Sequence, residues 1–211
     1  MSDIAISILN CDFNNIKFEL NRINDSRIKY VHIDIMDGKF VPAVSINLAE
    51  LRDANQLFNL EIHLMVKEPE KYLESCNTIG AKRVYFHLEG AKDPKAVLLA
   101  MEQYQFERGI AINPETTVEQ LTPYVKNVDA VLLLSIVPGA QGNTFIPEVA
   151  EKILEIKGLN EKLLVGMDGG VGEGNIQDIF TKGADYIVAG SAVWKAKDPI
   201  VSLRELQEMI Y

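Results

Sequence analysis

Three short segments of this chain each place histidine or aspartate at the end of an apolar run. They are Val31-His32-Ile33-Asp34, Glu61-Ile62-His63-Leu64 and Val165-Gly166-Met167-Asp168. In an extended strand, residues two apart point to the same side, so His32 and Asp34 would present a nitrogen and an oxygen ligand together. Two histidines and two carboxylates make a mixed site that suits zinc, iron, manganese or cobalt and needs no thiolate. Taken singly, each segment could also be a strand end whose polar residue hydrogen-bonds to a loop.

The length and composition favour one domain that spans residues 1–211, although the length alone would also permit two. The chain is 47% hydrophobic, which is enough for a full core, and no low-complexity linker or charge block marks a boundary. A net charge of -9 and a pI near 4.9 argue against nucleic acid as a partner. No segment resembles a secretion signal or approaches the roughly 18 apolar residues of a membrane span, which predicts a cytoplasmic protein without membrane contact. Cys11 and Cys76 are too few and too far apart for a disulfide framework or a thiolate metal site.

Short apolar runs alternate with amphipathic stretches along the sequence. Eight strands are expected at Ile4–Leu9, Tyr30–Asp34, Leu60–Leu64, Arg83–His87, Gly109–Ile112, Ala130–Ser135, Leu163–Met167 and Tyr186–Ala189. Helices are expected at Asn15–Asn24, Leu48–Phe58, Pro69–Ile79, Pro94–Gln103, Val118–Val125, Pro147–Lys157, Asn175–Lys182 and Pro199–Ile210, with Gly80 and Gly183 as left-handed C-caps. Strict alternation implies a parallel sheet, and eight units of about 25 residues match an α/β fold, the single-domain (β/α)8 TIM barrel. A doubly wound open sheet is the alternative, but the glycine spacing in Asp168–Gly174 is not GxGxxG.

A barrel would bring the polar strand ends of this chain together. Chemistry in such barrels lies at the carboxyl ends of the strands, where Ser7, Asp34, His63 and Asp168 fall. Glycines follow the last three strands, at Gly139 and Gly142, at Gly169 and Gly170, and at Gly190-Ser191. Loops of this kind, with the N-terminus of a short helix after strand eight, often bind phosphate, because glycine lets the backbone approach a ligand closely. The sequence therefore predicts a small phosphorylated substrate.

Five segments together resemble the ribulose-phosphate 3-epimerase family. They are Ser7-Ile8-Leu9, His32-Ile33-Asp34-Ile35-Met36-Asp37-Gly38 with Phe40-Val41-Pro42, His63-Leu64-Met65-Val66, Asp168-Gly169-Gly170-Val171 and Ala189-Gly190-Ser191-Ala192. The segments occur in order and at the expected spacing from Ile4 to about Lys197.

The resemblance implies a metal-dependent isomerase that interconverts D-ribulose 5-phosphate and D-xylulose 5-phosphate, and a homo-oligomer is expected. It implies one divalent ion per chain, zinc before iron, manganese or cobalt, held by His32, Asp34, His63 and Asp168. Asp34 and Asp168 would also be the acid/base pair of a two-base proton transfer through an enediolate. The substrate-binding residues would be Ser7, Met36, His63, Met65, Gly139, Ala140, Gln141, Gly142, Gly169, Gly170, Gly190 and Ser191.

The chain departs from the family pattern at positions that would shape the substrate pocket. Leu134 replaces a usual Met, Ala140 and Gln141 replace a Phe and a Gly, Lys39 replaces a His, Ala43 replaces an Asn and Ile6 replaces a Pro. None of these changes removes a proposed metal ligand or acid/base carboxylate, so the reaction type is expected to be kept. A six-carbon ketose phosphate such as D-allulose 6-phosphate remains open as the substrate.

Two other functions compete with an epimerase. A lyase on a related barrel needs Asp-x-Lys-x-x-Asp on strand two, but Met36 stands in the Lys position. A non-catalytic phosphosugar-binding homologue would explain the altered loop Gly139–Gly142, although the intact ligands and carboxylates argue against it. Among the remaining residues, His87 is expected beside the site and not as a ligand, Asp37 as a cap of the Gly38 turn, and Phe40 and Trp194 as packing residues.

Overall fold

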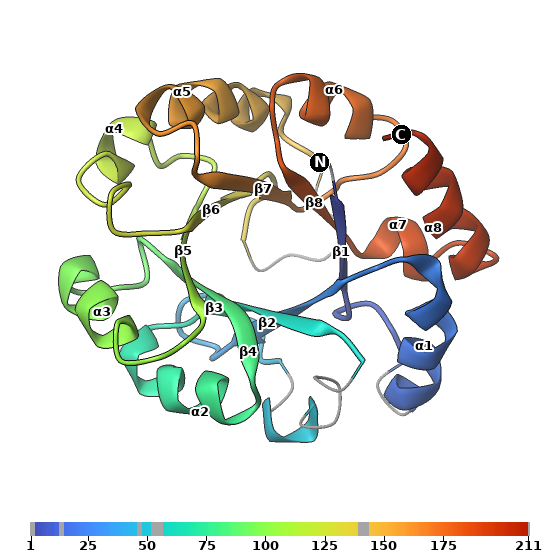
Figure 1. The fold of residues 1–211 in the computed structure, drawn as a ribbon, viewed down its shortest axis with the longest axis horizontal. Helices are drawn as coiled ribbons and strands as arrows, with labels where there is room; N and C mark the ends of the chain where they lie inside the picture. Colours follow the sequence, from blue (N-terminus) through green and yellow to red (C-terminus); the bar gives the residue numbers. More distant parts are fainter. Residues whose placement is uncertain (1–2, 13–14, 46–47, 52–56, 139–143, 211) are drawn as a thin grey trace.

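Eight parallel strands close into a barrel in the computed structural model, and helices surround them (Figure 1). The structure describes residues 3–12, 15–45, 48–51, 57–138 and 144–210. The strands are β1 (Asp3–Ser7), β2 (Tyr30–Met36), β3 (Asn59–Met65), β4 (Ala81–His87), β5 (Glu107–Ile112), β6 (Ala130–Leu134), β7 (Leu164–Asp168) and β8 (Tyr186–Ala189). Each strand pairs with the next along the chain, and β8 pairs with β1. The closed ring confirms the (β/α)8 barrel and excludes the open doubly wound sheet.

The helices lie outside the ring of strands (Figure 1). They are α1 (Ile16–Ile23), α2 (Leu73–Thr78), α3 (Pro94–Met101), α4 (Val118–Leu121), α5 (Lys152–Leu159), α6 (Ile176–Thr181), α7 (Ser191–Trp194) and α8 (Pro199–Glu208), with 3-10 segments η2 (Asn24–Ser26), η3 (Leu48–Leu51), η5 (Pro69–Tyr72) and η6 (Pro147–Glu151). Asp93 and Asp198 cap α3 and α8, because each side chain accepts hydrogen bonds from N–H groups of the first turn. A proline follows each cap and suits the first helical position. In the described part of the chain, no helix is long and apolar enough to cross a membrane.

Several expected elements differ at their ends. Strand β1 stops at Ser7 and not at Leu9, because the chain turns there and the Cys11 N–H bonds to the Ile8 carbonyl. Helix α4 stops at Leu121 and not at Val125, since Pro123 has no N–H with which to continue the helix. Part of the helix expected at Leu48–Phe58 lies outside the described residues. Its start is the 3-10 segment η3, and its last two residues are not helical.

Side chains alternate across each strand of the barrel. On β2, Val31, Ile33 and Ile35 pack in the main hydrophobic core, which includes buried side chains of α1, α2, α3 and α5. The intervening His32 and Asp34 point to the barrel interior, where they meet side chains of β3 and β7. The expected two-residue period is therefore confirmed on this strand.

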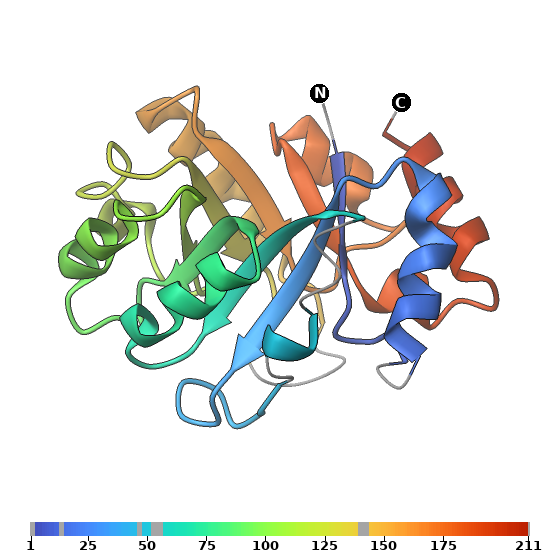
Figure 2. The same cartoon turned by 60° about the horizontal axis from the view of Figure 1, so that its bottom comes forward.

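Glycines inside two strands make room for two large rings in the barrel. A Cβ atom on Gly109 of β5 would lie 2.1 Å from Tyr85 Cδ1, and one on Gly166 of β7 would lie 2.2 Å from Tyr186 Cζ. The two phenol oxygens are 2.5 Å apart and buried. Figure 2 shows the strands from the side, with the arrowhead of β2 directed toward the loop that follows it in blue. The carboxyl ends of the strands therefore lie on the side of the barrel where this loop is.

Candidate metal centre and substrate cavity

Four side chains from three strands converge inside the barrel near its carboxyl end. One ligand atom from each of His32, Asp34, His63 and Asp168 lies within 4.8 Å of the others. His63 Nδ1 is 3.0 Å from Asp34 Oδ1 and 3.4 Å from His32 Nε2. Asp168 Oδ2 lies 3.5 Å from His63 Nδ1 and 3.7 Å from His32 Nε2. The structure therefore brings together all four residues that the sequence indicated as ligands.

The strand order explains how the four meet. Asp34 and His63 are Cα partners in the register of β2 with β3, so their side chains emerge side by side. Asp168 is on β7, which β8 and β1 separate from β2. Although Asp34 and Asp168 come from strands that are not neighbours, both side chains reach inward to the same two imidazoles.

The donor set fits a divalent metal ion. His32 Nδ1 lies 2.7 Å from Glu61 Oε1, which leaves Nε2 for the centre. His63 Nε2 lies 2.8 Å from His87 Nε2, which leaves Nδ1 for the centre. One available nitrogen from each ring and one oxygen from each carboxylate make a compact N/O site of the kind that zinc, iron, manganese or cobalt accepts. The four side chains are thus able to hold a metal ion.

Burial and mutual attraction set the charges of these groups. Burial alone would raise the pKa of Asp34, but the charge of His32 and hydrogen bonds with both histidines bring the pKa well below its usual value. Burial alone would lower the pKa of His32, but the charge of Asp34 and hydrogen bonds with Asp34 and Glu61 raise it well above its usual value. The centre therefore keeps an ionised carboxylate in a buried position, where it favours a cation strongly.

His87 lies beside the centre, as expected, and is not one of the four converging residues. Its Nδ1 is 3.1 Å from Glu89 Oε2, and Glu89 Oε1 accepts hydrogen bonds from the Asn113 N–H and the Thr116 hydroxyl. Burial lowers the pKa of His87 to about 4, so the ring is neutral at pH 7. His63 is therefore supported by a neutral imidazole.

A cavity opens above the four residues at the carboxyl end of the barrel. Its lining includes Ser7, Asp34, Met36, Met65, Asp168, Gly169, Gly170, Gly190 and Ser191, all of which the sequence indicated. Met36, Met65 and Leu134 belong to one apolar cluster and form a wall of the cavity. His63 is fully buried beneath this lining. Gly139, Ala140, Gln141 and Gly142 lie outside the described residues.

Hydrogen bonds orient the strand ends around the cavity. The Ser7 hydroxyl donates to Asp34 Oδ2 at 3.1 Å and accepts from the Leu9 N–H. Trp194 Nε1 donates to the Ser7 carbonyl at 2.7 Å, so Trp194 does more than the packing we expected. Asp37 accepts from the N–H groups of Lys39 and Phe40, as its predicted capping role requires.

Sequence reasoning missed three functional candidates. Glu61 and Arg83 are buried and ion-paired beneath the centre, with Arg83 Nη1 2.9 Å from Glu61 Oε2. Burial would raise the pKa of Glu61, but its contacts with His32 and Arg83 lower it. Glu61 stands two residues before His63, and this spacing alone could have placed it inside the barrel. Lys195 lines the cavity, and no sequence pattern indicated it.

The fold and these side chains define a (β/α)8-barrel protein with a two-histidine, two-aspartate centre at the carboxyl ends of its strands. A model of the ribulose-phosphate 3-epimerase family matches residues 3–194. The chain belongs to this family, and it is accordingly an enzyme of the isomerase class.

Individual relatives agree with this placement. The ribulose-phosphate 3-epimerase of Helicobacter pylori is 31% identical over 98% of this chain and 97% of its own. That of Chlamydia muridarum is 34% identical over 93% of this chain and 90% of its own. Among solved structures, 3-hexulose-6-phosphate synthase from Salmonella typhimurium matches with a TM-score of 0.75 at 10% identity, over 99% of this chain and 98% of that one. Orotidine 5'-phosphate decarboxylase from Pyrococcus horikoshii matches with a TM-score of 0.71 at 15% identity, over 98% of both chains. These two structures share the fold alone.

Proposed function

We propose that the protein epimerises carbon three of a ketose phosphate and interconverts D-ribulose 5-phosphate and D-xylulose 5-phosphate. The observation that carries this proposal is that Asp34 on β2 and Asp168 on β7, two strands that are not neighbours, converge on one buried centre below the cavity. Epimerisation removes a proton beside a ketone and returns one to the opposite face. It therefore requires a base on one face of the substrate and an acid on the other, and two carboxyl groups that approach from different strands can fill these roles.

The side chains of the cavity divide the work. One of Asp34 and Asp168 takes the proton from carbon three as a carboxylate, and the other returns a proton to the opposite face as a carboxylic acid. In the reverse reaction the two exchange roles. The Ser7 hydroxyl orients Asp34 through its hydrogen bond. Met36 and Met65 keep water away from the enediolate that lies between the two steps.

His32, Asp34, His63 and Asp168 would hold one divalent ion, with zinc as the first candidate and iron, manganese and cobalt as the others. When bound, such an ion supplies a Lewis acid that stabilises the negative charge on the substrate oxygens. His32 and His63 would each offer one ring nitrogen to the ion, because buried neighbours occupy the other ring nitrogen.

The phosphate would lie on the glycine side of the cavity. Gly169 and Gly170 line the cavity. Their φ angles of +100° and +67° lie in the left-handed region, which suits glycine. Lys195 is the basic residue among the described residues that line the cavity, and its charge would offset that of the phosphate. Helix α7 is the short helix expected after strand eight, and with only four residues its dipole would make a small contribution. The part played by Gly139–Gly142 stays a prediction.

One observation favours a six-carbon substrate as the second candidate. Ala43 lines the cavity where the family pattern has an Asn, and the smaller side chain leaves more room. D-Allulose 6-phosphate has one carbon more than D-ribulose 5-phosphate and could use this room.

A coupled assay with each ketose phosphate, before and after treatment with a chelator, tests the proposal. We expect turnover that is lost with chelator and restored by a divalent ion, with solvent deuterium incorporated at carbon three of the product. Binding of both sugar phosphates without turnover would indicate the non-catalytic homologue. Release of a carbon fragment in place of an epimer would indicate the lyase.

A further inference from the structure

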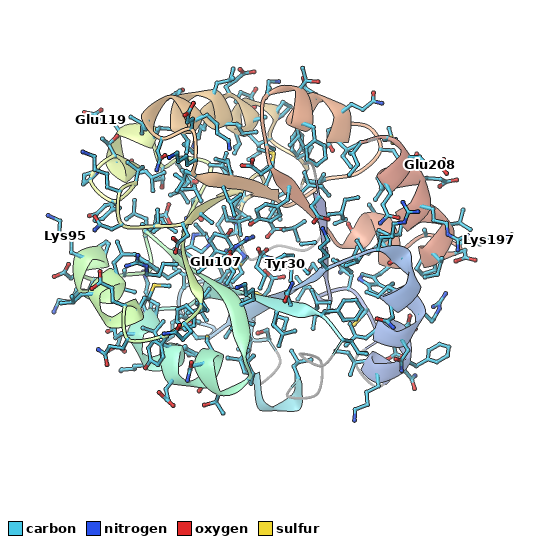
Figure 3. All side chains as sticks on the ribbon, in the orientation of Figure 1. Tyr30, Lys95, Glu107, Glu119, Lys197 and Glu208 are labelled. Atoms are coloured by element: carbon cyan, nitrogen blue, oxygen red, sulfur yellow. The ribbon has the colours of Figure 1, made fainter. Side chains whose placement is uncertain are left out.

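A cluster of charged and aromatic side chains fills the barrel beneath the metal centre. Arg83 on β4 is buried between two carboxylates, with Nη1 2.9 Å from Glu61 Oε2 and Nη2 2.6 Å from Glu107 Oε2. The rings of Tyr30 and Tyr186 flank its guanidinium, at 4.9 and 5.3 Å. Figure 3 labels Tyr30 and Glu107, which lie within the ring of strands.

Glu61 connects this cluster to a metal ligand. Its Oε2 accepts from Arg83, and its Oε1 lies 2.7 Å from His32 Nδ1. An ionised carboxylate can only accept hydrogen bonds, so His32 Nδ1 carries the proton. When the imidazole is neutral, as a metal ligand must be, its lone pair lies on Nε2, the atom that faces Asp34, His63 and Asp168.

A merely structural role explains this arrangement poorly. Glu61 has no exposed surface, and burying an ion pair is often no more stabilising than packing apolar side chains of similar volume. The other imidazole ligand, His63, meets the imidazole of His87 and no carboxylate at the corresponding ring nitrogen. The charged support is therefore confined to one ligand, and Arg83 Nη1 holds it in place with a charged hydrogen bond to Glu61 Oε2.

We propose that Arg83 and Glu61 are positioning residues that fix the tautomer and orientation of His32 and thereby set the affinity of the site for a divalent ion. A charged acceptor on Nδ1 makes Nε2 a stronger donor to the metal. The inference rests on the proposed function only for its metal site. It does not depend on which sugar phosphate the protein uses.

The test measures metal binding and not turnover. The full-length protein and its variants are stripped of metal, and Co²⁺ and Zn²⁺ are titrated in competition with a chelating indicator. Glu61→Gln should weaken the affinity by about 10- to 100-fold and alter the visible spectrum of bound Co²⁺. Arg83→Met should have a smaller effect in the same direction, and Arg83→Lys should recover part of it. Glu107→Gln is the matched control, because Glu107 contacts Arg83 and not His32, and it should stay within about twofold of the parent.

Thermal unfolding of the metal-free variants separates support of the ligand from support of the fold. If Glu61→Gln lowers the melting temperature but binds Co²⁺ with parent affinity and spectrum, the proposal is overturned. The same holds if Glu107→Gln weakens binding as much as Glu61→Gln does, or if the parent binds no divalent ion. Should Glu61→Gln fail to fold, the comparison of Arg83→Met with Arg83→Lys decides. A parent that binds metal but turns over no ketose phosphate would overturn the epimerase and leave this inference standing.

Discussion

The two ends of the barrel interior both carry buried polar side chains, but they differ in whether these side chains already have partners. At the carboxyl end, Asp34 and Asp168 border a cavity, and their oxygens converge with two imidazole nitrogens on one centre. At the amino end, Arg83 already has two carboxylate partners and two aromatic neighbours, and Tyr85 pairs with Tyr186. Both ends are buried and polar, but among the described residues the ligand atoms that converge on one point lie at the carboxyl end.

This difference indicates that a buried polar residue in a barrel is not by itself evidence of catalysis. What distinguishes the functional end is that its donors and acceptors face a common point that a ligand can reach. Glu61 belongs to both ends, because one carboxylate oxygen meets His32 and the other meets Arg83. Substitutions at the carboxyl end should therefore affect the reaction most. At the amino end, substitutions outside the path from Arg83 through Glu61 to His32 should affect mainly the fold.

The largest expected effect is the loss of turnover on substitution of the carboxylates at the carboxyl end of the barrel. Asp34→Asn and Asp168→Asn should each lower kcat by about a thousandfold or more, because each removes a proton-transfer group and a metal ligand together. The double variant should be little worse than either single variant, since both side chains act in one step. Steady-state kinetics with the metal-loaded proteins measures this. Retention of most of the parent rate by either variant would refute the two-base assignment.

The alternation of strands and helices made the barrel predictable from sequence. Inward residues such as His32 and Asp34 could be assigned because their apolar neighbours fix the phase of the strand. Their positions near strand ends then placed them at the functional end of the barrel. Local patterns were sufficient for these residues.

The charged cluster around Arg83 and the hydrogen bonds around the cavity depend on contacts between segments that are distant in the sequence. Glu61 pairs in register with Arg83, and Arg83 with Glu107, but a charged residue in a strand gives no sign of its partner across the sheet. Trp194 donates to a carbonyl 187 residues away. Both interactions follow from barrel closure and strand register, which a single sequence does not specify.

A smaller effect is expected at the phosphate side of the cavity. Lys195→Ala should raise KM about tenfold with little change in kcat, because a charged hydrogen bond to the phosphate contributes about 1.5 kcal/mol or more to binding. Lys197→Ala is the control, since Lys197 is exposed and lies at the outer edge of the molecule (Figure 3). Equal effects of the two substitutions would mean that only the overall charge matters, and would place the phosphate elsewhere.

A still smaller effect should follow when the neutral support of His63 is changed. His87→Gln should weaken metal affinity by no more than about threefold, because an amide can replace a neutral imidazole as the hydrogen-bond acceptor and neither carries charge. Competition titration against the parent, with Glu61→Gln alongside, measures the difference. If both variants lose affinity equally, the two imidazole ligands do not differ in the way that their neighbours suggest.

The smallest effect on the reaction is expected for the Tyr85–Tyr186 pair at the amino end of the barrel. Burial raises the pKa of both Tyr85 and Tyr186, so both phenols stay protonated and share a hydrogen bond. Tyr85→Phe should lower the free energy of unfolding by about 1–2 kcal/mol, because it leaves the buried Tyr186 hydroxyl without this partner.

The double variant Tyr85→Phe/Tyr186→Phe should recover part of that loss, since removing both polar groups leaves neither unsatisfied. Urea unfolding measures the stability of the parent, both single variants and the double variant, and kinetics is measured on the same samples. We expect kcat/KM to stay within about twofold throughout, because neither tyrosine lines the cavity or belongs to the four converging residues. A loss of kcat/KM that exceeds the loss of stability would show that the Tyr85–Tyr186 pair also acts on the site and not on the fold alone.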